Sequence, residues 1–111
     1  MTNPAEHYSY RVRWSAEDDE YVGTVAELPS LSWLAPTRRE AFEGIQDLAT
    51  EVIADMQANA ETVPVPMGER VFSGKFMVRV PAEVHRALAI EAAEQNVSLN
   101  QLAATRLAHA C

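Results

Sequence analysis

The chain has 111 residues, which is enough for one ordinary domain or two very small ones. Nine basic and 16 acidic side chains give a formal net charge of −7, which is unusual for a protein that binds nucleic acid. The one cysteine, Cys111, allows neither an intrachain disulfide nor a metal site built from cysteines. No apolar run is long enough to span a membrane, and the N-terminus lacks the features of a signal peptide, so we expect a cytoplasmic protein.

The charge is divided unevenly along the chain. From Ser73 onwards, four basic and three acidic side chains give a net charge of +1, so the first 72 residues carry −8. The acidic part should repel phosphate and attract a basic protein. Any affinity for DNA should come from the C-terminal part and should be modest and sensitive to salt.

Three short strands are predicted over residues 8–35. Aromatic and apolar residues alternate with polar ones from Tyr8 to Trp14, which is the period of a half-buried strand. The acidic turn Glu17–Glu20 separates this strand from a second strand, Tyr21–Glu27, so the two should form a hairpin. A Leu-Pro-Ser break then precedes a third short strand, Leu31–Ala35.

A long amphipathic helix is predicted after these strands. Thr37 is the expected N-cap, Glu40 completes a capping box, and the helix should run to about Asn59. The following segment, Thr62–Pro66, is expected to be an extended edge strand, and Met67–Phe72 a linker. The apolar stripe of the helix comprises Ala41, Ile45, Leu48, Ala49, Val52, Ile53 and Met56, and its acidic face comprises Glu43, Asp47, Glu51 and Asp55.

The two tryptophans are open to different roles. Trp14 continues the apolar face of the first predicted strand and is expected to lie in the core. Trp33, in the third strand, is either a core residue or an aromatic anchor for a protein partner.

No catalytic or metal site is predicted. The four acids of the Glu17–Glu20 turn are consecutive and should splay apart, and the first predicted strand offers no carboxylate for a metal-dependent nuclease. The histidines His7, His85 and His109 are far apart in the sequence, so an ordinary surface role is expected for each. We therefore expect no enzymatic activity, no metal and no cofactor.

The last third of the chain predicts one strand followed by two helices. Polar and apolar residues alternate from Lys75 to Val80, which gives a basic face and an apolar face. Pro81 ends the strand and starts a helix, Ala82–Gln95. Asn96 suits a left-handed residue after that helix, and Ser98 suits the N-cap of the next one. So small a unit cannot bury its own apolar face and should need a second copy.

This arrangement resembles the ribbon-helix-helix family, to which the Arc and MetJ repressors belong. The resemblance implies that two chains pair their strands into a ribbon that enters the DNA major groove, and that the second helix holds a phosphate at its N-terminus. Taken alone, the alternation also fits a half-buried strand whose basic residues face water. The implied DNA contacts are Lys75, Met77, Arg79, Ser98, Leu99 and Asn100. The implied dimer core is Phe76, Val78, Val80, Val84, Leu88 and Leu102.

The order of elements over nearly the whole chain is similar to that of the HicB-type antitoxins. The resemblance implies that the N-terminal domain is a partial, inactive RNase H-like fold. This domain would bind a small basic HicA-like toxin, an RNase that cuts mRNA. The chain departs from the family pattern at Ser30-Leu31, where Gly-Cys is usual, and at Ala35-Pro36, where Gly-Asp is usual. The motifs that carry the resemblance are the aromatic first strand, Glu17–Glu20, Tyr21–Val25, Leu28-Pro29, Thr37–Ala41 and Val63–Pro66.

We therefore expect an α+β protein with a β-β-β-α(-β) partial RNase H-like domain over residues 1–66, a linker over 67–72 and a ribbon-helix-helix domain over 73–111. The expected function is that of an antitoxin, which occludes a HicA-like toxin and represses its own operon as a dimer or tetramer. The alternative is a ribbon-helix-helix regulator without a toxin partner. Its N-terminal domain would then oligomerise or sense a ligand.

Overall fold

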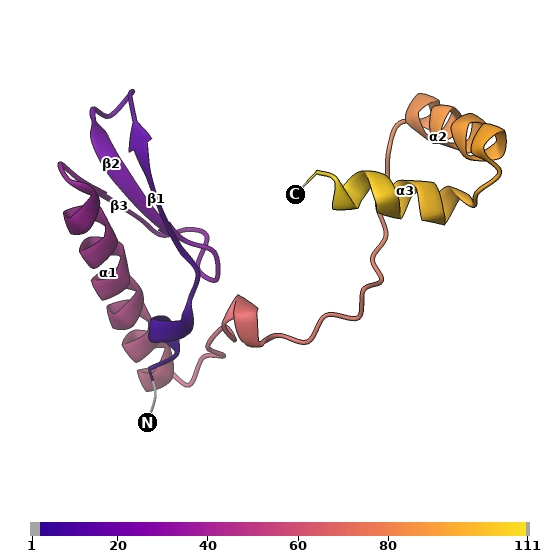
Figure 1. Ribbon diagram of the computed structural model, residues 1–111. Helices are drawn as coiled ribbons and strands as arrows, with labels where there is room; N and C mark the ends of the chain where they lie inside the picture. Colours follow the sequence, from indigo (N-terminus) through magenta and orange to yellow (C-terminus); the bar gives the residue numbers. More distant parts are fainter. Residues whose placement is uncertain (1–2, 111) are drawn as a thin grey trace. The chain divides into compact units, whose positions relative to one another are not determined.

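The computed structural model describes residues 3–110, so Cys111 lies outside the described residues. The chain divides into two compact units, Met1–Phe72 and Ser73–Cys111 (Figure 1). A three-stranded antiparallel sheet and one long helix form the first unit, and two helices form the second, which confirms the α+β class. Within residues 3–110, no helix combines the length and the apolar character needed to cross a membrane.

The sheet of the first unit has the strand order β1-β2-β3. β1 (Tyr10–Ser15) pairs with β2 (Glu20–Val25), and β2 pairs with β3 (Ser32–Ala35), all antiparallel. The three predicted strands are therefore present. β1 begins at Tyr10 and not at Tyr8, because Tyr8 is the C-cap of the short 3-10 helix η1 (Pro4–His7) and the N–H of Ser9 bonds to the Glu27 side chain.

Helix α1 (Arg38–Ala58) covers one face of this sheet (Figure 1). The hydroxyl of Thr37 accepts a hydrogen bond from the backbone N–H of Glu40 at 3.2 Å, which confirms the predicted N-cap. The side chains that α1 buries recur every four residues, so they lie on one side of the helix. These buried residues are Ala41, Ile45, Ala49 and Ile53.

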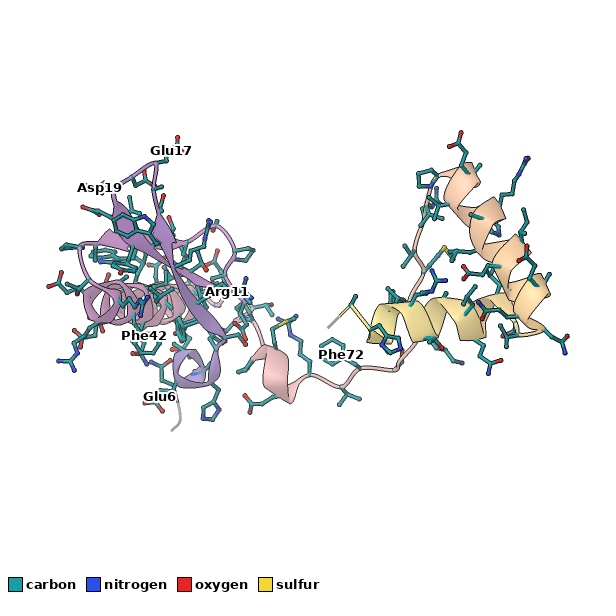
Figure 2. The ribbon with its side chains drawn as sticks, turned by 45° about the horizontal axis from the view of Figure 1, so that its top comes forward. Glu6, Arg11, Glu17, Asp19, Phe42 and Phe72 are labelled. Atoms are coloured by element: carbon teal, nitrogen blue, oxygen red, sulfur yellow. The ribbon has the colours of Figure 1, made fainter. Side chains whose placement is uncertain are left out.

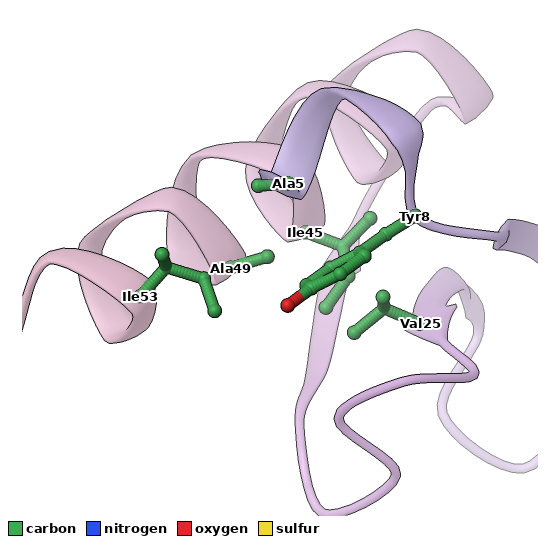
Figure 3. Packing of buried hydrophobic residues seen from close by; sticks show 6 residues of the cluster. All are labelled: Ala5, Tyr8, Val25, Ile45, Ala49 and Ile53. Carbon is green, nitrogen blue, oxygen red and sulfur yellow. The ribbon is translucent and has the colours of Figure 1, made fainter. Parts of the chain in front are cut away.

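The core of the first unit lies between α1, the sheet and η1 (Figure 3). Gly23 of β2 faces α1 directly, since an added Cβ would lie 2.7 Å from the carbonyl oxygen of Ala41 and 2.8 Å from Cγ2 of Ile45. The missing side chain therefore lets the helix approach the central strand closely. The buried residues drawn in Figure 3 are Ala5, Tyr8, Val25, Ile45, Ala49 and Ile53.

The predicted edge strand over Thr62–Pro66 is wrong, because this segment forms no strand. It passes along the core instead, where Val63 packs against the buried cluster and the hydroxyl of Tyr8 donates to the carbonyl oxygen of Pro64 at 2.6 Å. Its prolines lack the N–H that a ladder needs, which gives a physical reason. A second 3-10 turn, η2 (Met67–Glu69), lies in the predicted linker.

The prediction that Trp14 is a core residue is also wrong, since its side chain is 50% exposed. Trp14 lies near the hairpin end of β1, opposite Tyr21, and packs edge-on against that ring with centroids 5.1 Å apart. Arg38, the first residue of α1, lies over the ring of Tyr21 at 5.5 Å. Because the helix begins there, nothing of α1 extends further to cover Trp14.

The second unit contains α2 (Ala82–Gln95) and α3 (Leu99–Ala108). Asn96 adopts the left-handed conformation, with φ 58° and ψ 42°, and ends α2 as predicted. The hydroxyl of Ser98 accepts a hydrogen bond from the backbone N–H of Gln101 at 3.0 Å, so the predicted cap of α3 is confirmed. Local sequence signals therefore place both helices correctly.

Candidate functional site

The predicted ribbon strand, Lys75–Val80, is exposed along its whole length and forms no strand in the single chain. Its beginning is fixed by a turn, in which the backbone N–H of Lys75 donates to the hydroxyl of Ser73 at 3.1 Å and Gly74 has φ +82°. Phe76 remains 74% exposed. A strand cannot form without a hydrogen-bonded neighbour, so the ribbon prediction requires a second chain.

The N-terminus of α3 offers backbone donors. The Ser98 hydroxyl takes the N–H of Gln101, and the N–H of Leu102 donates to the Ser98 carbonyl at 3.0 Å. The N–H groups of Leu99 and Asn100 precede the first intrahelical bond and point out of the helix end. Free N–H groups at the positive end of a helix dipole suit a phosphate.

The basic side chains of the second unit differ in whether they hold the helices together or stand on the exposed segment. Arg106 of α3 forms an ion pair with Glu91 of α2, and the side chain of Gln95 donates to the same carboxylate at 3.1 Å. Arg106 is therefore engaged in holding the two helices together. Lys75 and Arg79, in contrast, stand on the exposed segment before α2.

The second unit does not close a core of its own. Within residues 73–110, the buried hydrophobic residues are Ala92 and Leu102. Of the predicted dimer core, Leu102 is thus already covered inside one chain, and Leu88 is half-buried. Contiguous exposed apolar surface on a small protein unit is typical of an interaction site. The large apolar side chains left exposed are Phe76, Met77, Val78, Val80, Val84, Ile90 and Leu107.

The acidic turn of the first unit lies at the tip of the β1–β2 hairpin, where Figure 2 shows Glu17 and Asp19 pointing outward. The carboxylate of Asp18 accepts a hydrogen bond from the hydroxyl of Ser15 at 2.8 Å, and Asp19 has φ 55°. In the part of the chain that the structure describes, no three His, Cys, Asp or Glu residues are grouped so as to hold a metal ion. The turn is therefore accounted for by its own hydrogen bonding.

Glu27 is a structural residue that the sequence did not reveal. Its side chain is 6% exposed, and its two carboxylate oxygens accept the backbone N–H groups of Ser9 at 2.8 Å and of Met67 at 2.7 Å. Burial acts to raise the pKa of Glu27, but these hydrogen bonds outweigh it and hold the pKa below its ordinary value. The carboxylate thus joins the start of β1 to the segment after α1.

Helix α1 carries a row of acidic side chains on its exposed side. Successive residues of an α-helix turn by about 100°, so residues three and four apart lie next to each other. These acids follow that spacing and form one continuous surface, which we call the acidic ridge. Its members are Glu40, Glu43, Asp47, Glu51 and Asp55.

Part of the chain matches the model of a known protein family. Residues 58–107 match the model of the HicB family. Over this stretch the chain is HicB-like. Neither the curated proteins nor the solved structures contain a match.

The matched stretch begins at the end of α1 and reaches Leu107 in α3. It therefore includes the exposed segment before α2, the left-handed Asn96 and the Ser98 cap. The HicB family suggests, at a coarse level, an antitoxin-like role with a toxin as partner, because its members are generally antitoxins and not enzymes.

Proposed function

We propose that this HicB-like chain is the antitoxin of a type II toxin–antitoxin system. It neutralises a small basic HicA-like toxin, an mRNA-cleaving RNase, by occlusion with its first unit, a partial RNase H-like domain. With its second unit it represses its own operon. The observation that carries the proposal is the HicB match, which covers the exposed segment before α2, all of α2, and α3 as far as Leu107.

The DNA-binding part of the proposal rests on the exposed segment before α2. In a dimer, two such segments pair into an antiparallel ribbon that fits a major groove. Lys75 and Arg79 then donate to guanine edges, and Met77 lies against thymine methyl groups. The free N–H groups of Leu99 and Asn100 hold a backbone phosphate and fix the register of the ribbon.

Dimer formation follows from the apolar surface of the second unit. Pairing the two segments turns Phe76, Val78 and Val80 towards the helices, which removes three largely exposed apolar side chains from water in each chain. The dimer core also takes in Val84 and Leu88. One chain alone buries too little apolar surface to compensate for the conformational entropy lost on folding.

The toxin-binding part of the proposal rests on charge. The first 72 residues carry −8, and α1 gathers five of the acids into the acidic ridge. A small basic RNase is attracted by this field and bound through complementary charges. The bound antitoxin then covers the surface on which the toxin would hold mRNA.

Operator binding is tested by fluorescence anisotropy on a duplex from the region upstream of the gene, across a salt series. Arg79→Ala should cost about 1–3 kcal/mol on this duplex and remove its preference over a scrambled one. Arg13→Ala, which removes the same charge from the first unit, is the matched control and should retain that preference. Equal loss of specific and scrambled binding in both variants would contradict readout by Arg79.

Toxin binding is tested by co-expression with the product of the neighbouring gene, which the proposal predicts to be a small basic protein. A complex that suppresses the RNase activity of that protein supports the antitoxin function. If no complex forms while operator binding is intact, the protein is a ribbon-helix-helix regulator without a toxin, and its first unit serves oligomerisation or ligand sensing.

A further inference from the structure

β3 is one of the two edges of the sheet, and no segment within residues 3–110 pairs with its outer side. The backbone N–H of Ala26, just after β2, donates to the carbonyl oxygen of Ser9, just before β1, at 2.9 Å. Successive residues of an antiparallel strand direct their backbone N–H and C=O groups alternately to one neighbouring strand and to the other. The even-numbered residues of β2 therefore bond to β1 and the odd-numbered ones to β3. By the observed register, the backbone groups of Ser32 and Leu34 point outward from the sheet.

The side chains of β3 do not protect this edge from pairing with another strand. Proteins usually protect an edge strand with charged residues, proline or a covering segment. β3 carries no charge, and its two large apolar residues, Trp33 and Leu34, are 44% and 45% exposed. The other edge, β1, carries Arg11 and Arg13 among its six residues. The two edges are thus built differently, and only that of β3 is suited to accept another strand.

Trp33 also locates this edge relative to α1. The indole of Trp33 lies directly against Gly44, because a Cβ added at that glycine would collide with the indole ring. Trp33 pairs with Gly23, which faces α1, so Trp33 shares the helix-facing side of the sheet, and Leu34 lies on the opposite side. The edge therefore presents one apolar side chain on each face.

The acidic ridge borders the same side of α1. Gly44 has Glu40 four residues before it and Asp47 three residues after it, and these are its neighbours on the helix surface. The other side of α1 is turned towards β1, where Phe42 packs edge-on against Tyr10 with ring centroids 5.8 Å apart. The uncharged edge and the negative surface are consequently adjacent.

We propose that the outer edge of β3 binds an extended segment of a basic protein, which adds to the sheet as a fourth strand. This inference rests on the proposed function and names the surface that the toxin occupies. The added strand bonds to the backbone of Ser32 and Leu34 and covers the exposed parts of Trp33 and Leu34. Its basic side chains on the helix side pair with Glu40 and Asp47.

A second copy of this chain is the poorer occupant of the same edge. Two β3 strands paired about a two-fold axis form one continuous sheet with both α1 helices on the same face. The two acidic ridges then approach each other, and like charges repel. A basic partner carries the opposite charge to this surface, so electrostatic attraction favours binding of the basic partner over binding of a second copy of this chain.

Amide hydrogen exchange of the whole chain, alone and with the neighbouring gene product that is predicted to be the toxin, tests the proposal directly. In the free protein, the amides of Ser32 and Leu34 should exchange rapidly, whereas those of Trp33 and Ala35 are protected by β2. In the complex, the Ser32 and Leu34 amides should slow by about a hundredfold. The outward amides of β1 should not change.

Two variants with a matched control complete the test. Ser32→Pro removes an outward N–H at the first residue of β3, where proline is tolerated, and should weaken the complex about tenfold. Asp47→Lys should weaken it by a similar factor at low salt, and less at high salt. Glu6→Lys makes the same charge change on η1, the 3-10 helix labelled at Glu6 in Figure 2, and should alter affinity less than about twofold.

Each outcome supports or overturns a stated proposal. A complex with protection at Ser32 and Leu34 supports both. A complex that leaves these two amides unprotected overturns the edge proposal and leaves the antitoxin function standing. Protection that grows with protein concentration in the free chain assigns the edge to a second copy and overturns the proposal. Absence of any complex overturns the antitoxin function, and the edge proposal with it.

Discussion

The two units of the chain use similar helices but reach stability in different ways. In the first unit, α1 buries four side chains against a sheet, η1 and the segment Thr62–Pro66, so one chain closes the core. In the second unit, α2 and α3 bury Ala92 and Leu102, while Phe76 and Val78 stay in water. An amphipathic helix is therefore not sufficient for a core, because a second apolar layer must be present to cover it.

This comparison predicts that the two units respond differently to dilution. The first should unfold at the same denaturant concentration at any protein concentration, whereas the second should gain stability from a partner chain. Trp14 and Trp33 both belong to the first unit, so tryptophan fluorescence reports on that unit alone.

Ile45→Ala should have the largest effect on the first unit. Ile45 is completely buried beneath β2, so the truncation leaves a cavity and should lower the free energy of unfolding by about 3–4 kcal/mol. Urea denaturation followed by tryptophan fluorescence measures the change. Val65→Ala, at a 54% exposed site of the same unit, is the control and should cost less than about 1 kcal/mol. A midpoint for either variant that depends on protein concentration would contradict the comparison.

Phe76→Ala should have its effect only on association. The side chain lies in the proposed dimer core, so its loss should weaken the dimer by about 2–3 kcal/mol, or roughly a hundredfold in Kd. Sedimentation velocity across a dilution series measures this constant. Val71→Ala, at a 97% exposed site of the first unit, should leave it unchanged. A wild-type chain that is monomeric at all micromolar concentrations would show that the second unit needs no partner.

Glu27→Gln should make the first unit less stable and less sensitive to acid. A glutamine can accept only one of the two backbone N–H bonds, so the variant should lose about 2 kcal/mol at neutral pH. Because the folded-state pKa of Glu27 is lowered, its contribution is fully present above the unfolded value of about 4.3 and disappears as pH falls through the folded pKa. The difference between wild type and variant should therefore shrink below about pH 4. A difference in urea midpoint that is constant from neutral pH downward would contradict the role of the carboxylate.

The smallest effects come from the helix caps, which are chemically alike in the two units. Thr37→Ala and Ser98→Ala each remove a hydroxyl that accepts an N–H of the first helical turn, and each should cost about 1 kcal/mol. The cost of Thr37→Ala should appear in the tryptophan-monitored unfolding. That of Ser98→Ala should appear only in the hydrogen exchange of α3. An effect of Ser98→Ala on tryptophan unfolding would show that the two units unfold together.

The local features of both units were predictable from sequence because neighbouring residues decide them. Thr37 and Ser98 were recognised as caps, since a hydroxyl before an apolar run can reach the free N–H groups of the next turn. Asn96 was recognised from its tolerance of a positive φ. Four acids of the acidic ridge, Glu43, Asp47, Glu51 and Asp55, followed from helical periodicity alone, whereas Glu40 was recognised only as part of the cap.

Other features depended on which segments meet in space. Trp14 has the strand periodicity of a core residue, yet the position of the α1 N-terminus leaves it exposed. Glu27 was not recognised, because its two donors lie 18 and 40 residues away in the sequence. The returning segment Thr62–Pro66 packs through side chains and not through a ladder. Long-range contacts of this kind leave no local sequence pattern.

The sequence by itself determined helices α1, α2 and α3, their capping residues and the division of charge, because helices and caps depend on residues within a few positions of one another. Only the tertiary structure decided that β3 is an open, uncharged edge beside the acidic ridge, since this requires the strand order and the contact of Trp33 with Gly44. It also decided that Leu102 of the predicted dimer core is covered within one chain, whereas Phe76 and Val78 stay in water. Burial depends on how the elements of the folded chain pack together, whereas periodicity shows only which face of an element is apolar.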